Sequence, residues 1–181
     1  MSEEFITGLI TGVIATSIGF GFTMLWDLWK INREQNQKTD SVLLAVEHEL
    51  QENIEIGKAN KELLEAELPV LKKGNYLIIA TLPFKKEIWG LLKLNLPNKL
   101  LKNEAMLRKL SSITMTISHL NEGMNSRQVY RDTSSNNTAF SDNMKGRNSM
   151  LISEIEELLE NIDMAITELN KKANKSVKQT D

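Results

Sequence analysis

The stretch from Phe5 to Trp26 runs for 22 residues without an ionisable side chain. As an α-helix, a segment of this length spans about 33 Å, enough to cross the roughly 30 Å hydrocarbon core of a bilayer. A buried core helix of this length normally carries a polar stripe, and a signal peptide normally begins with basic residues, whereas Glu3 and Glu4 precede this segment. The sequence therefore predicts a transmembrane anchor over residues 1–29.

Positive charge begins only after this anchor, at Lys30, Arg33 and Lys38, whereas the N-terminal flank carries only acidic side chains. Cytoplasmic flanks of membrane helices are enriched in Lys and Arg, and interfaces are enriched in tryptophan. We therefore predict a single-pass protein of the cell membrane with its N-terminus outside and its C-terminal domain in the cytoplasm. Trp26 and Trp29 are the predicted interface belt.

Small residues inside the anchor follow one helical stripe, at Gly8, Gly12, Ala15 and Gly19. In lipid, close approach of two helices at small residues supplies packing that the hydrophobic effect cannot supply. The stripe predicts helix packing in the membrane, either in a homo-oligomer or against another subunit of a membrane complex. The alternative is a monomeric anchor with ordinary glycine content.

The composition of the whole chain excludes several classes of protein. The net charge is −2, with 41% hydrophobic and 25% charged residues, which is ordinary globular usage and gives no basis for nucleic-acid binding. The absence of cysteine excludes disulfides, thiolate zinc sites and cysteine nucleophiles within this chain.

Residues 42–173 are predicted to form a small antiparallel helical bundle, so the fold class is all-α, with three long helices and one short one. The first long helix covers residues 41–68, and Pro69 indicates its end. The second and third, over residues 98–130 and 148–173, carry apolar residues in 4-3-4-3-4 steps typical of bundle faces. These steps fall at Met106, Leu110, Ile113, Ile117, Leu120 and Met124, and at Leu151, Ile155, Leu158, Ile162, Ala165 and Leu169.

The segments between the long helices are less regular. Residues 30–41 are predicted as a juxtamembrane linker or an extension of the anchor helix, and residues 76–82 as a short strand or a buried connector. A short amphipathic helix fits residues 84–95. Residues 132–147 are predicted to form a mobile loop, and residues 174–181 a disordered tail.

Polar residues on the first bundle helix suggest a role in register. Asn53 and Asn60 are seven residues apart beside the apolar face, and a buried asparagine in a helix seam sets register. Gly57, which costs about 1 kcal/mol relative to Ala in a helix, would permit close helix approach. The alternative is that both asparagines are hydrated at the margin of the face. The acidic residues Glu62, Glu65 and Glu67 are interpreted as part of a solvated face.

No motif for catalysis or metal binding is present. His48 has Glu52 four residues on and His119 has Glu122 three residues on, but the Glu-x-x-His pairs of a di-iron bundle are missing. Phosphate-loop, dinucleotide and hydrolase-elbow motifs are also missing. We therefore expect no enzyme activity, no catalytic residue, no metal, no cofactor and no small-molecule substrate.

Several single residues carry a resemblance to a known group of proteins: Glu49, Asn53, Thr81, Pro83, Trp89, Ile117 and Asn121. Together with the N-terminal anchor, this order over residues 45–125 resembles uncharacterised prokaryotic single-pass membrane-anchored helical-bundle proteins. The resemblance implies the anchor and the bundle, and no activity.

The sequence thus predicts a non-enzymatic membrane-anchored protein whose partners are membrane lipid and other helices. Its role would be oligomerisation, or holding a partner at the membrane. The alternative is a membrane-perturbing effector, phage-defence or holin-like, that assembles through its Gly/Thr-rich helix.

Overall fold

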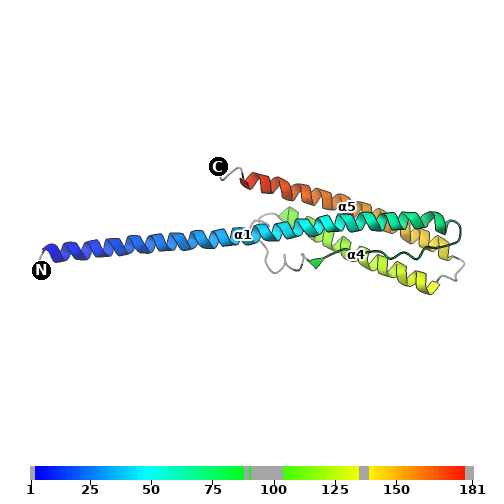
Figure 1. Cartoon of the computed structure of the whole chain (residues 1–181), viewed down its shortest axis with the longest axis horizontal. Helices are drawn as coiled ribbons and strands as arrows, with labels where there is room; N and C mark the ends of the chain where they lie inside the picture. The colour runs from blue at the N-terminus through cyan, green and yellow to red at the C-terminus, as the bar shows by residue number, and fades with distance from the viewer. Residues whose placement is uncertain (1–2, 88–89, 91–103, 135–138, 178–181) are drawn as a thin grey trace. The chain divides into compact units, whose positions relative to one another are not determined.

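The computed structural model describes residues 3–87, 90, 104–134 and 139–177. Side chains are described in these ranges except at residues 3–18, 36, 39 and 172–177. Three helices are present in this part: α1 (Glu3–Leu71), α4 (Glu104–Ser134) and α5 (Phe140–Val177) (Figure 1). With no strand among the described residues, the protein is all-α, as predicted.

The chain divides into two compact units, Met1–Ser41 and Val42–Asp181. Helix α1 contributes to both, and residues 30–41 are helical throughout. The described residues contain no helical stretch that is both long and apolar enough to cross a membrane. The side chains of Gly8, Gly12 and Ala15 lie outside the described residues.

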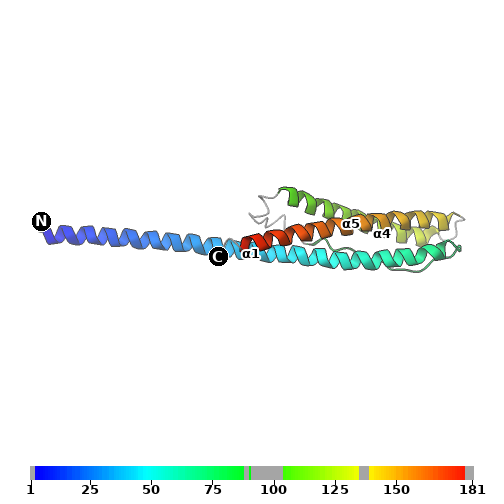
Figure 2. The same ribbon diagram turned by 90° about the horizontal axis from the view of Figure 1, so that it is seen from above.

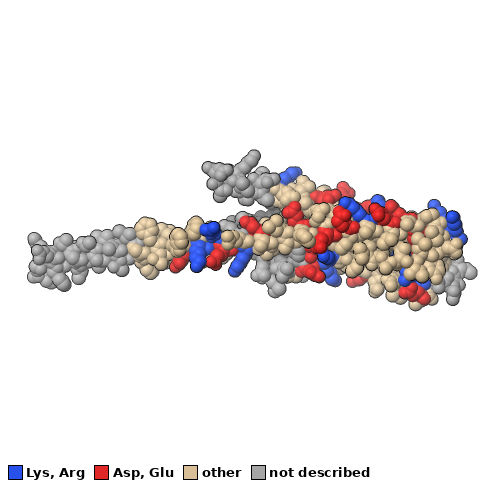
Figure 3. Space-filling model, in the orientation of Figure 1, with Lys and Arg blue, Asp and Glu red and all other residues tan. Residues whose placement is uncertain are grey.

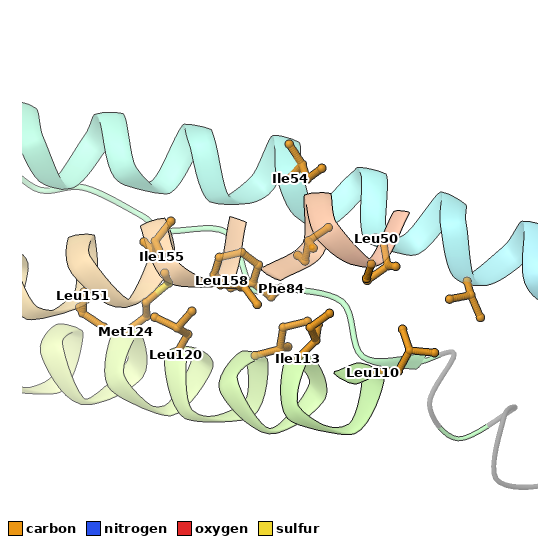
Figure 4. Close-up of a cluster of buried hydrophobic side chains, with 14 of the residues drawn as sticks. Leu50, Ile54, Phe84, Leu110, Ile113, Leu120, Met124, Leu151, Ile155 and Leu158 are labelled. Carbon is orange, nitrogen blue, oxygen red and sulfur yellow. The ribbon is translucent and has the colours of Figure 1, made fainter. Parts of the chain in front are cut away.

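The second unit is a helical bundle in which α4 and α5 pack side by side, with the C-terminal half of α1 along them (Figures 1 and 2). Its core is made of apolar residues at heptad spacing, which meet between the three helices (Figure 4). Each such side chain contributes about 1.5–3 kcal/mol when buried. The buried set is Val46, Leu50, Ile54, Leu64, Met106, Leu110, Ile113, Ile117, Leu120, Met124, Leu151, Ile155, Leu158, Ile162 and Ala165.

The charged residues of the bundle lie mostly on its surface (Figure 3). In the same view, acidic and basic side chains are interspersed along the helices. Exposed ion pairs such as Lys61–Glu156, with 2.7 Å between Nζ and Oε1, join neighbouring helices there. Solvent screening makes exposed pairs of this kind weak, so the core and the buried polar contacts described below carry most of the stability.

The prediction of a mobile loop over residues 132–147 is wrong for residues 132–134 and 140–147, which are helical, and residues 135–138 lie outside the described residues. Helix α4 continues to Ser134, and α5 begins at Phe140. The reason is a second apolar cluster at this end of the bundle, where Phe140 and Met144 are buried against Leu71 and Tyr130.

Helix α1 ends two residues beyond Pro69 in a glycine cap. Gly74 has a φ of 78°, and the N–H groups of Asn75 and Gly74 donate to the carbonyls of Val70 and Leu71 at 3.2 and 3.0 Å. Two such hydrogen bonds, together with a glycine in the left-handed conformation, terminate helices and reverse the direction of the chain.

The chain then runs back along the bundle as an extended segment, residues 75–86, which we call the strap (Figure 1). The strap is neither helix nor strand, so residues 76–82 are not the predicted strand, and the buried connector is only partly right, because Ile79 is the buried residue among them. The predicted short helix over residues 84–95 begins later than expected, because Phe84 belongs to the strap and Glu87 and Gly90 are the helical residues described there. The rest of that helix, and residues 98–103 of the predicted second helix, lie outside the described residues.

Candidate functional site

A row of three polar side chains runs along the bundle face of α1. Asn53, Asn60 and Glu67 are spaced seven residues apart, and each is fully buried at 0% exposure. Buried polar groups of this kind persist only when their hydrogen bonds are satisfied. The partners of these three side chains therefore define what this face recognises.

Asn60 and Asn53 each bind one residue of the strap through its backbone. The amide nitrogen of Asn60 donates to the carbonyl of Leu82 and its Oδ1 accepts from the N–H of Leu82, both at 2.8 Å. Asn53 makes the same two bonds with the carbonyl and N–H of Lys85, at 2.9 and 2.8 Å. A carboxamide carries the same donor and acceptor as a peptide group, so each pair resembles strand pairing.

The same arrangement comes from the opposite side, on α4. Asn121 accepts from the N–H of Phe84 at 2.8 Å and donates to the Phe84 carbonyl at 2.9 Å. The strap is therefore held between α1 and α4 by three asparagines whose side chains form hydrogen bonds with its backbone. We call the space between these two helices the strap groove. Each bond contributes about 0.5–1.5 kcal/mol net, and leaving such groups unpaired costs more.

Phe84 is the main apolar anchor of the strap, with 3% exposure. It lies among the core residues of the three helices (Figure 4). A Cβ at Gly57 would stand 3.4 Å from the Phe84 ring and 2.8 Å from Cδ2 of Leu159 on α5. Gly57 thus lets α1 approach both the strap and α5 closely.

Glu67, the third member of the row, joins the three helices. It pairs with Arg127 of α4, and its Oε2 accepts from the amide of Asn148 on α5 at 2.8 Å. Arg127 also donates through Nε to Asn148 Oδ1 at 2.7 Å. All three side chains are almost fully buried. The interpretation of Glu67 as part of a solvated face is therefore wrong, because its charge is compensated inside the bundle.

Two further contacts hold the N-terminal half of the strap. Oε1 of Glu67 accepts from the N–H of Leu77 at 3.3 Å, and Arg131 donates to the carbonyl of Ile79 at 3.0 Å. Within the strap, the Ile79 side chain is buried, whereas the Ile78 side chain is 85% exposed on the outer face. The strap thus alternates between inward anchors and outward side chains, as extended chain does.

An exposed ion pair lies at the C-terminal end of the strap. Lys85 Nζ is 2.6 Å from Oε1 of Glu52, and His48 Nδ1 is 3.3 Å from Oε2 of the same carboxylate. The hydrogen bond from Lys85 holds the pKa of Glu52 below its usual value, and the same bond raises the pKa of Lys85. The pair thus remains ionised at neutral pH and ties α1 to the strap on the outside.

The second histidine lies apart from this site. His119 Nε2 is 3.5 Å from Glu154 Oε1 on α5. Within the described residues there is no group of three or more potential metal ligands.

In the first unit, Trp26 and Trp29 are exposed, and their ring centroids are 5.2 Å apart. The guanidinium of Arg33 lies 5.3 Å from the centroid of the Trp29 ring. The hydroxyl of Thr23 donates to the carbonyl of Gly19 at 2.9 Å, so this polar group is satisfied within the helix.

Asn53 and Gly57, the residues predicted to affect bundle register, both lie at the strap groove. The sequence analysis named Asn121 only as part of the resemblance, and it missed Arg127 and Asn148. Arg127 and Asn148 continue the apolar steps of α4 and α5, since they stand three residues after Met124 and three before Leu151. Their position in the apolar repeat was the sequence signal that could have predicted their burial.

Comparison with known proteins adds no relative to this description. No protein-family profile, curated protein or solved structure matches the chain.

Proposed function

We propose that the protein is a non-enzymatic, membrane-anchored interaction protein that holds its helical bundle at the cytoplasmic face of the cell membrane. One observation carries this proposal, namely a cluster of eight exposed large apolar side chains within residues 20–31 of α1. This cluster, which we call the apolar run, consists of Phe20, Phe22, Met24, Leu25, Trp26, Leu28, Trp29 and Ile31, each at least half exposed.

These side chains surround the helix instead of forming one face. At about 100° per residue, Phe20, Leu25 and Trp26 point in three different directions. A helix that is apolar all round belongs in a protein core or in a bilayer, and apolar patches of this size on a surface need a cover. Asp27 and Lys30 lie within the C-terminal part of the run, and from Trp26 back to Phe5 the sequence carries no charged side chain. Lipid is the cover that fits this pattern.

The polar groups in this stretch also suit a lipid environment. Lipid offers no hydrogen bonds, so the hydroxyl of Thr23 must bond within the helix, as it does with Gly19. Trp26, Trp29 and Arg33 follow in the order expected for an interface, aromatic before basic. A Cβ at Gly19 would meet nothing within 4 Å, so this end of the glycine stripe is open to a partner helix. We infer that copies of the protein, or another membrane subunit, associate there.

Alkaline carbonate extraction of native membranes tests the anchor. The full-length chain should stay in the pellet, and a Phe22→Glu/Leu25→Glu variant should be released, because two charges inside the apolar run oppose insertion. Met115→Glu/Met150→Glu, at exposed positions of the bundle, is the matched control and should stay in the pellet. Release of the unmodified protein would contradict the proposal.

A measurement of the membrane potential of cells that express the protein distinguishes the proposed function from its rival, a membrane-perturbing effector. An interaction protein leaves the potential intact. Its collapse on expression of the full-length chain, but not of the Phe22→Glu/Leu25→Glu variant, would favour the effector.

A further inference from the structure

In the N-terminal half of the strap, the backbone is bound along one edge only. The bound residues are Leu77 and Ile79, through the side chains of α1 and α4 described above. Within the described residues, no hydrogen bond involves the backbone groups of the alternate residues Tyr76, Ile78 and Ala80. In extended chain, the N–H and C=O groups of alternate residues point to opposite edges. Residues 76–80 therefore have one bound edge and one free edge.

The side chains along this part of the strap are apolar and uncharged. Tyr76, Ile78 and Leu82 are exposed on the outer face. Proteins normally protect an exposed edge of extended chain with charged side chains or proline, because its unpaired groups are a template for another chain. Residues 76–82 contain neither. The free edge is therefore suited to pairing with another extended segment.

The free edge is also held in the conformation that pairing requires. Hydrogen bonds at Leu77, Ile79 and Leu82 fix the strap on either side of the free groups. The ring of Tyr76 lies edge-on to that of Phe140 on α5, with 5.4 Å between the ring centroids. A segment that binds here would order few groups of the protein, and such preorganisation raises affinity.

Lysines stand at both ends of the uncharged segment and indicate the charge of its partner. Lys72 and Lys73 precede the segment, and Lys85 and Lys86 follow it. Lys85 is paired with Glu52, whereas the other three are exposed and form no ion pair in the described part of the chain. These charges favour a partner with acidic residues at the ends of its segment. They disfavour a second copy of the strap, which would bring lysines against lysines.

We propose that residues 76–80 form a docking edge for an extended segment of a partner protein, which pairs with it as an added β-strand while the strap stays in its groove. The partner segment is uncharged in its centre, with apolar side chains that contact Ile78 and Leu82, and it carries Asp or Glu at its ends. Main-chain hydrogen bonds supply the affinity, and the side chains supply the specificity. The inference rests on the proposed function for the role of the bundle in interaction, and it adds the chemistry of the partner.

A synthetic peptide tests the docking edge on the purified full-length protein in detergent micelles. The probe is fluorescein-labelled Glu-Glu-Thr-Val-Thr-Val-Thr-Glu-Glu, and fluorescence anisotropy should show saturable binding. Two further peptides carry N-methyl groups on one or the other alternate set of central residues. Pairing through a single edge predicts that one set weakens binding about tenfold, which corresponds to 1.4 kcal/mol of lost hydrogen bonding, and that the other set has little effect.

Substitutions in the protein locate the bound peptide. Ile78→Pro removes an N–H from the free edge and should weaken binding about tenfold, whereas Ile78→Val keeps both backbone groups and should change it little. Lys72→Glu/Lys73→Glu should weaken binding severalfold, and Lys58→Glu/Lys171→Glu, at exposed positions elsewhere, should not. Circular dichroism shows whether each variant is folded. If Ile78→Pro does not fold, the two N-methylated peptides decide alone.

The outcomes separate this inference from the function on which it rests. If both N-methylated peptides bind as tightly as the probe, backbone pairing is wrong. If a peptide with Lys in place of Glu binds equally well, the acidic partner chemistry is wrong, and if the probe shows no saturable binding, the docking edge itself is wrong. Each of these results leaves the membrane anchor standing, because carbonate extraction tests the anchor independently of peptide binding.

Discussion

At the scale of single residues, Gly57 sets how closely three elements can meet. A side chain there points at Leu159 and the Phe84 ring, with the Leu159 methyl only 2.8 Å from a Cβ. An alanine could be accommodated by rotation of the flexible leucine, whereas a larger side chain would displace Phe84 from its pocket. Gly57 is thus the point at which helix packing and strap binding depend on one another.

We predict that Gly57→Leu lowers the free energy of unfolding by about 1–3 kcal/mol, as overpacking of a core does. Urea unfolding followed by far-UV circular dichroism measures it. Gly146→Leu is the control, because a Cβ there meets nothing within 4 Å and helix propensity favours leucine. Equal midpoints for the two variants would show that the close approach at Gly57 carries no energetic weight.

Residue patterns predicted the apolar half of this structure and little of the polar half. The 4-3-4-3-4 steps of α4 and α5 identify the core because burial repeats with the helix period. The partner of Asn121, in contrast, stands 37 positions away in the sequence. Local spacing carries no information about such a contact. In the sequence, an arginine such as Arg127 interrupts the apolar stripe. Its burial can be inferred only when its partners on the two other helices are known.

At the scale of helices and connectors, the buried Glu67–Arg127–Asn148 cluster joins one side chain from each of α1, α4 and α5. Charges inside a bundle are tolerated only as a complete set, because each would otherwise be desolvated without compensation. The cluster therefore fixes the three helices relative to one another more strictly than apolar contacts, which tolerate sliding.

We predict that Arg127→Met alone costs about 3–5 kcal/mol, because it leaves the Glu67 carboxylate buried without its cation. The double variant Glu67→Leu/Arg127→Met should be more stable than Arg127→Met alone. A double-mutant cycle in urea measures the coupling. Additive effects of the two single substitutions would show that the pair makes no specific contribution.

The helix that includes the glycine stripe calls for a separate test. We predict that Gly12→Ile weakens self-association of the full-length chain about tenfold, since a loss of 1.4 kcal/mol in helix packing corresponds to that factor. Gly21→Ile adds the same bulk off the stripe and should have little effect. Co-purification of differently tagged copies and a membrane association reporter measure the change. Identical behaviour of the two variants would show that the glycine stripe does not mediate association and that the proposed anchor only attaches the protein to the membrane.

At the scale of the whole molecule, the chain combines two units with opposite surface chemistry. Side chains 20–31 of the first unit are largely apolar and exposed, whereas the second unit buries its apolar residues and interleaves charges on its surface. Such a division suits a protein that divides its chain between lipid and water. For the proposed anchor, the charges on each side of the apolar run would determine the orientation in the membrane.

We predict that the C-terminus is cytoplasmic, because Lys30, Arg33 and Lys38 follow the apolar run and Glu3 and Glu4 precede it. A C-terminal reporter that functions only in the cytoplasm should be active. Replacing the three basic residues by Gln and adding three lysines after Met1 should reverse the result. Activity of an exported reporter on the unmodified chain would move the bundle to the outer face.

The even spacing of Asn53, Asn60 and Glu67 also constrains how this chain can vary in evolution. An insertion or deletion of a single residue between them rotates the rest of α1 by about 100° and turns the next polar side chain away from its partner. A change of seven residues preserves the face, but adds or removes one whole contact to the strap. Among descendants of one ancestral bundle, this part of α1 should therefore keep its length or change it in steps of seven residues, with the strap lengthening or shortening to match.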